Sequence, residues 1–82
     1  MHPVFVTRPV RSVEDLGAAI IVAAYGRAAA ETPPVPRNLD ALADLLRETQ
    51  VRRVVVTDWR VPEASIGGLL DVFADTGVEL DR

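Results

Sequence analysis

Three prolines within four residues, Pro33, Pro34 and Pro36, divide the regular structure of this sequence into two segments. A proline lacks a backbone donor and pushes the residue before it toward extended geometry, so neither a helix nor a central strand can run through them. Residues 31–37 are therefore expected to form a stiff surface loop. The segments on either side must supply all the regular structure.

The segment before the loop predicts one strand and one helix. Residues 3–7 are short, apolar and rich in β-branched side chains, which is typical of a strand. Ser12 stands three residues before the carboxylate of Asp15, the spacing of a hydroxyl cap at a helix start. Apolar residues then recur every three to four positions, which predicts a helix from Ser12 to about Ala29.

The segment after the loop begins with a helix whose start is marked by Asn38, an N-cap residue. Leucines at helical spacing form its expected buried stripe, and the helix is expected to end near Thr49. The same spacing directs Asp40, Asp44 and Arg47 away from the core.

The rest of the chain predicts a strand, a helix and a short last strand. The valine run within residues 52–59 is too short for a helix and is expected to be a central parallel strand buried on both faces. A helix over residues 65–75, capped by Ser65 and stopped by Gly77, leads to an edge strand at 78–80. The predicted fold class is α/β, in which three helices in the order β-α-α-β-α-β pack a three-stranded parallel sheet.

Length and composition indicate one globular domain over residues 1–82. A chain of 82 residues, 49% hydrophobic and 26% charged, supports a single core and has no apolar run long enough for a membrane span. With no cysteine and an N-terminus unlike a secretory signal, the chain is expected to be cytoplasmic. The net charge of −3 argues against direct nucleic-acid binding and favours a basic partner.

The candidates for chemistry are few. His2 is the only imidazole and stands beside the chain terminus, where it is expected to be a solvent-exposed bystander. None of the hydroxyl residues lies in a nucleophile-elbow pattern, and Gly67-Gly68 lacks the further residues of a phosphate loop. We therefore expect a protein that is not an enzyme, with no catalytic residues, metal site or cofactor.

Asp40 and Asp44 leave two interpretations open. Like charges four residues apart are mildly unfavourable in a helix, and Arg47 can relieve Asp44 as a partner three residues away. In one interpretation the three residues form a solvated helix face with no function. In the other, a rigid helix presents two carboxylates to a cationic partner, and composition does not decide between them.

Four segments resemble one family in the same order along almost the whole chain. They are 11–16 (RSVEDL), 38–46 (NLDALADLL), 55–60 (VVTDWR) and 69–73 (LLDVF). The chain is similar in these segments to the barstar-like intracellular inhibitors of extracellular ribonucleases. The resemblance implies a three-stranded parallel sheet packed by helices, which agrees with the assignment above.

The function that the resemblance implies is that of an immunity protein, which blocks the active site of a secreted basic ribonuclease with carboxylates that stand in for RNA phosphates. Asp44 matches the carboxylate that enters the phosphate site, Asp40 a second interface aspartate and Asn38 the asparagine at the helix start. Asp75 matches a further interface acid. The expected partner-binding residues are thus Asn38, Asp40, Asp44 and Asp75, together with Arg37 and Pro36 at the end of the loop.

The chain departs from the family pattern beside these residues. Residues 34–37 (Pro34, Val35, Pro36 and Arg37) stand where the family has aromatic residues and a glycine, and Ala43 replaces a tryptophan between the two aspartates. Aromatic anchors often dominate interfaces, so a weaker contact or a differently shaped target is expected. The alternative function is a non-enzymatic interaction or regulatory domain that binds a different partner, or itself, through residues 33–37 and the short last edge of the sheet.

Overall fold

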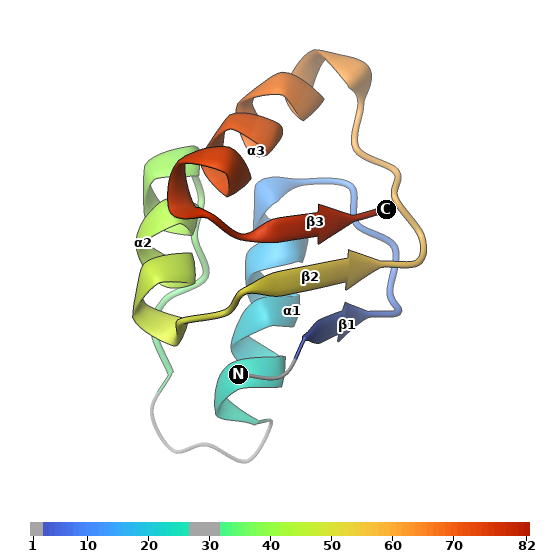
Figure 1. Cartoon of the computed structure of the whole chain (residues 1–82). Helices are drawn as coiled ribbons and strands as arrows, with labels where there is room; N and C mark the ends of the chain where they lie inside the picture. Colours follow the sequence, from blue (N-terminus) through green and yellow to red (C-terminus); the bar gives the residue numbers. More distant parts are fainter. Residues whose placement is uncertain (1–2, 27–31) are drawn as a thin grey trace.

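The computed structural model describes residues 3–26 and 32–82, and in them three helices pack against a three-stranded parallel sheet (Figure 1). The elements are, in chain order, β1 (Val4–Val6), α1 (Val13–Tyr25), α2 (Leu39–Thr49), β2 (Arg53–Val56), α3 (Glu63–Thr76) and β3 (Glu79–Asp81). The strands lie in the order β1-β2-β3, so β2 is central, as its valine run predicts. His2 lies outside the described residues.

The core lies between the three helices and one face of the sheet. Valines of β1 and β2 alternate toward it, and leucines and isoleucines of the helices meet them there. The most completely buried side chains come from all these layers: Leu16, Ile20, Leu42, Leu46, Leu69, Val6, Val10 and Val54. This single apolar cluster is the main source of stability for so small a chain.

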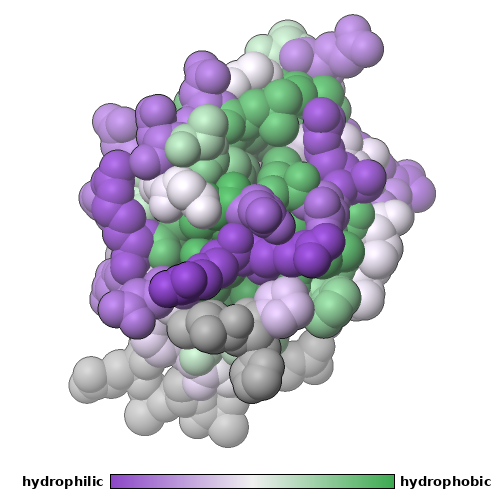
Figure 2. Space-filling model, viewed as in Figure 1, coloured by the Kyte–Doolittle hydropathy of each residue, from purple (hydrophilic) through white to green (hydrophobic). Residues whose placement is uncertain are grey.

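The opposite face of the sheet is open, so the expectation of a central strand buried on both faces is wrong. Phe5 of β1 is exposed, and Val55 beside it on β2 is only half-buried. Arg53 lies on the same face and contacts Asp81 and Glu79 of β3. Figure 2 shows hydrophilic side chains crossing the middle of this face. One guanidinium and two carboxylates are costly to bury, because each charged group would lose its hydration. This cost favours a sheet face that stays open to water.

Side-chain caps fix the start of α1 as the sequence predicts. The Ser12 hydroxyl accepts a hydrogen bond from the Asp15 backbone N–H at 3.2 Å, and the Asp15 carboxylate accepts one from the Arg11 N–H at 3.0 Å. The helix ends earlier than expected, at Tyr25, because Gly26 adopts a φ of 83°. Of the expected continuation to Ala29, residues 27–29 lie outside the described part of the chain.

The third helix begins two residues earlier than its expected start. Its N-cap is Pro62, which has no side-chain acceptor for the first N–H groups of the helix, and the described contacts of α3 include no side-chain cap. The Ser65 backbone N–H donates to the Pro62 carbonyl at 2.8 Å, so Ser65 lies inside the first turn and the prediction that it caps the helix is wrong. Gly77 ends α3 as expected, with a φ of 72°.

Candidate protein-interaction site

A side-chain cap at Asn38 fixes the residue at which α2 begins. The side-chain oxygen of Asn38 accepts a hydrogen bond from the Ala41 N–H at 2.8 Å, and its backbone carbonyl accepts one from Leu42 at 3.1 Å. Asn38 therefore satisfies a donor that would otherwise lack an intrahelical partner. Because its side chain caps the helix, Asn38 fixes the start of α2 whether or not it also contacts a partner.

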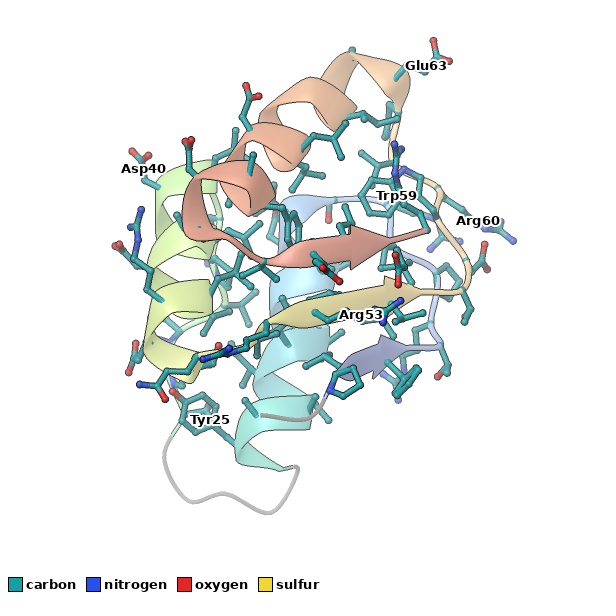
Figure 3. The ribbon with its side chains drawn as sticks, viewed as in Figure 1. Tyr25, Asp40, Arg53, Trp59, Arg60 and Glu63 are labelled. Atoms are coloured by element: carbon teal, nitrogen blue, oxygen red, sulfur yellow. The ribbon has the colours of Figure 1, made fainter. Side chains whose placement is uncertain are left out.

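The outer side of α2 carries the two expected aspartates. Leu42, Leu45 and Leu46 are buried, whereas Asp40 and Asp44 are exposed one turn apart. Figure 3 shows Asp40 pointing away from the sheet at the first turn of α2. The positive end of the helix dipole favours a carboxylate there, which offsets part of the repulsion from Asp44.

Arg47 accompanies Asp44 but does not remove it from solvent. One guanidinium nitrogen lies 3.4 Å from the Asp44 carboxylate, and the two side chains are 60% and 79% exposed. An ion pair this open contributes little to stability. The Asp44 carboxylate can therefore exchange Arg47 for a cation of a partner at little cost.

The loop before α2 is fixed to α1 through Pro36. This side chain is buried, and a Cβ placed on Gly17 of α1 would lie 2.2 Å from its Cγ. Only a glycine permits so close an approach. The structure therefore gives Pro36 a packing role inside the molecule, in contrast to the partner contact expected for it, while Arg37 and Val35 on either side remain exposed.

The third helix places more acidic residues next to α2. The two helices pack directly against each other: a Cβ on Gly68 would lie 2.6 Å from the Leu39 Cδ1. Asp75 is exposed on the last turn of α3, the part of that helix that lies beside α2 in Figure 1. Asp71 is exposed one turn earlier and was not among the expected site residues. Its spacing of four residues from Asp75, the same as between Asp40 and Asp44, was the signal for it.

We call Asp40, Asp44, Asp71 and Asp75 the acidic face. Within the described residues, the Arg47 guanidinium pairs with Asp44 of this face. Four carboxylates on two helices of one rigid core create a negative field over that side of the molecule. Such a field attracts cationic proteins and repels nucleic acid.

The other candidate groups in residues 3–26 and 32–82 are not gathered into a site. Among the described residues, no three of the His, Cys, Asp and Glu side chains are grouped closely enough to hold a metal ion. Trp59 is half-buried at the margin of the core, where Arg82 lies over its ring at 5.3 Å from the centroid. Within the described chain its indole N–H is buried without a hydrogen-bond partner. Trp59 is thus mainly a packing residue.

Comparison with protein-family models, with curated proteins and with solved structures finds no match for this chain. The described helices include none that is long and apolar enough to cross a membrane. The class to which the structure assigns the chain is a small α/β domain with a three-stranded parallel sheet.

Proposed function

We propose that this protein is a barstar-like inhibitor that protects the cytoplasm of its host by blocking the active site of a secreted basic ribonuclease or related toxin. The observation that carries the proposal is the pair Asp40 and Asp44, exposed on successive turns of a capped helix. A ribonuclease cleft holds cations that bind the phosphates of RNA. Carboxylates held about one turn apart on a rigid helix match such a row of charges.

The structure supports the proposal through the rigidity of this face. Asn38 caps α2, Leu39 packs into the space left by Gly68, and Pro36 is seated on Gly17. Each contact fixes the backbone on which the carboxylates stand, so little conformational entropy is lost when a partner binds. Long-range attraction between the acidic face and a cationic cleft also speeds encounter.

The partner must differ in shape from one that receives an aromatic anchor. Ala43 lies between the two aspartates on α2 and is half-buried, so this part of the surface offers no large side chain. Among the large exposed apolar side chains of the described residues, Val35, 44% exposed in the loop before α2, is the nearest to Asp40 along the chain. The proposed contact therefore relies on charge more than on a deep apolar anchor.

A capture experiment with matched baits tests the proposal. The wild-type protein, the Asp40→Ala, Asp44→Ala variant and a charge-matched Glu14→Ala, Glu63→Ala variant are immobilised and exposed to culture medium and cell extract of the source organism. A basic ribonuclease retained by the wild type and the charge-matched control, but not by the α2 variant, is the expected result. A ribonuclease retained equally by all three baits would contradict the assignment of the site.

A further inference from the structure

The free edge of β1 exposes backbone groups that the sheet does not use. On its inner side β1 pairs with β2, and the Val6 carbonyl accepts a hydrogen bond from the Thr57 N–H at 3.1 Å. Backbone groups of successive residues in a strand point to opposite sides. The N–H and C=O of Phe5 therefore face away from β2, and the same alternation places the Pro3 carbonyl and the Thr7 N–H on that free edge.

An apolar shelf lies beside this edge. Phe5 is 65% exposed and Val22 of α1 is 43% exposed, both high values for large apolar side chains. The two residues line one groove of about 290 Å³, together with the small side chains of Ala18, Ala19 and Ala23 and, at its margin, the charged residues Arg8 and Asp15. In Figure 1, α1 passes behind the strands and ends beyond β1. A strand added to β1 would be covered on one face by this part of α1.

The two edges of the sheet differ in charge. The strand β3 carries Glu79 and Asp81, and a second β3 brought beside it would meet like charges, which is a common protection against edge pairing. Residues 3–7 carry no charge, and the first charged residue after them is Arg8. The edge at β1 is therefore the one that accepts another strand without electrostatic cost.

We propose that two copies of this chain associate through their β1 edges, antiparallel about a twofold axis at Phe5, to form a continuous six-stranded sheet. The backbone pattern is self-complementary in this arrangement. The two Phe5 residues exchange N–H and C=O hydrogen bonds, and the Thr7 N–H of each copy donates to the Pro3 carbonyl of the other. Because Pro3 has no N–H to donate, the hydrogen bonds between the two β1 strands end at Pro3 of each copy.

The symmetric arrangement also satisfies the side chains. The two exposed Phe5 rings become cross-strand neighbours, a favourable pair in antiparallel sheets. The two α1 helices lie on the same face and cover each other's Val22 and alanines, so the groove is filled. The Arg8 residues lie at opposite ends of the two-stranded ribbon and do not repel each other strongly. Closed twofold dimers are the commonest assemblies of soluble proteins.

The proposal is independent of the acidic face. The residues of that face belong to α2 and α3, whereas the dimer contact uses β1 and α1. A dimer would present two acidic faces and bind two copies of a partner. Failure of either proposal leaves the other standing, because the oligomeric state is measured on the isolated protein.

Sedimentation equilibrium of the full chain, from micromolar to millimolar concentration, tests the dimer. We expect the apparent mass to rise from 8.9 kDa to twice that value. Phe5→Glu and Val22→Glu should each weaken association by at least about tenfold, because each places a charge in the contact. Leu70→Glu, at an apolar residue 37% exposed on α3, is the matched control and should dimerise like the wild type.

A backbone test separates the proposed strand pairing from other apolar contacts. Thr7→Pro removes the edge N–H, whereas Thr7→Val keeps it, so only the proline variant should lose the dimer. Far-ultraviolet circular dichroism of each variant establishes that it is folded. A wild-type chain that stays monomeric at every concentration overturns the proposal and leaves this edge for a strand of a different protein. A dimer insensitive to Phe5→Glu and Val22→Glu overturns it as well.

Discussion

Pro36 packs directly against Gly17, although the two residues are far apart in the sequence. This contact attaches the loop before α2 to α1. A methyl group on Gly17 would lie 2.2 Å from the Pro36 Cγ and 2.5 Å from its Cδ. The contact joins the first part of the chain to the helix that carries Asp40 and Asp44. It links the stability of the fold to the geometry of the acidic face.

Substitution of Gly17 tests this contact. Gly17→Ala should destabilise the protein by about 1–3 kcal/mol, because Pro36 or the helix must move to admit the methyl group. Urea unfolding followed by Trp59 fluorescence gives the free energy of unfolding. Gly67→Ala is the control: a Cβ there meets nothing within 4 Å, and alanine is the better helix former, so it should stabilise the protein by about 1 kcal/mol. Equal effects of the two changes would contradict the packing described for Pro36.

The cap at Asn38 should be measurable in the same way. Asn38→Ala removes the acceptor for the Ala41 N–H and should lower the free energy of unfolding by about 1 kcal/mol. Asn38→Asp and Asn38→Ser retain an acceptor and should restore most of this loss. If both conservative variants are as unstable as the alanine variant, the side chain contributes by something other than capping.

Arg53 forms ion pairs with Asp81 and Glu79 on the open sheet face, and we call these three residues the Arg53 cluster. The contribution of this cluster to the free energy of unfolding should fall as the salt concentration rises. The hydrogen bonds that Arg53 donates to Asp81, followed by the charge of Asp81 and of Glu79, raise the pKa of Arg53 above its ordinary value. A raised pKa means that the contribution of Arg53 to stability is complete below its unfolded pKa and is lost only as the pH rises through the higher folded value. Neutral pH therefore leaves it intact.

Because the cluster is exposed, its contribution is screened by salt. Arg53→Gln should shift the urea midpoint downward slightly in dilute buffer, and the two proteins should converge in molar sodium chloride. A difference that persists unchanged at high salt would show that Arg53 acts through packing of its stem. The measurement needs only unfolding curves at two salt concentrations.

The order of elements could be predicted from the sequence because each boundary has a local chemical signal. Ser12 and Asn38 cap their helices through their own side chains, and Gly77 ends α3 with a positive φ, so these positions depend on few distant contacts. The start of α3 was misplaced because Ser65 carries the same signal as a cap. Pro62, immediately before the observed start at Glu63, was the alternative signal.

The open sheet face and the burial of Pro36 could not be predicted from residues close to them in the sequence. Three successive valines look the same in a strand covered on both faces and in one covered on a single face. The difference lies in Arg53, whose partners on β3 are 26 and 28 residues away. Proline-rich segments are usually exposed, and nothing near Pro36 in the sequence marks Gly17 as its partner. Such contacts depend on how the elements pack.

The acidic face could be predicted in part. Helical spacing was sufficient to place Asp40 and Asp44 off the leucine stripe, and the structure confirms that both are exposed. Asp71 and Asp75 lie near the α2 aspartates because α3 packs against α2 through Gly68. The pair Gly67-Gly68 in the sequence does not reveal which helix packs there. The role of these residues in binding stays a prediction.

Titration of a basic secreted ribonuclease with the protein, with RNA cleavage as the readout, tests the central claim most directly. We predict that the wild type and the charge-matched Glu14→Ala, Glu63→Ala variant inhibit at one inhibitor chain per enzyme. Asp44→Ala should keep its fold, because its exposed pair with Arg47 is worth at most about 1 kcal/mol, and yet inhibit at least about a hundredfold more weakly. Undiminished inhibition by a folded Asp40→Ala, Asp44→Ala variant would contradict the assignment of the acidic face as the inhibitory surface.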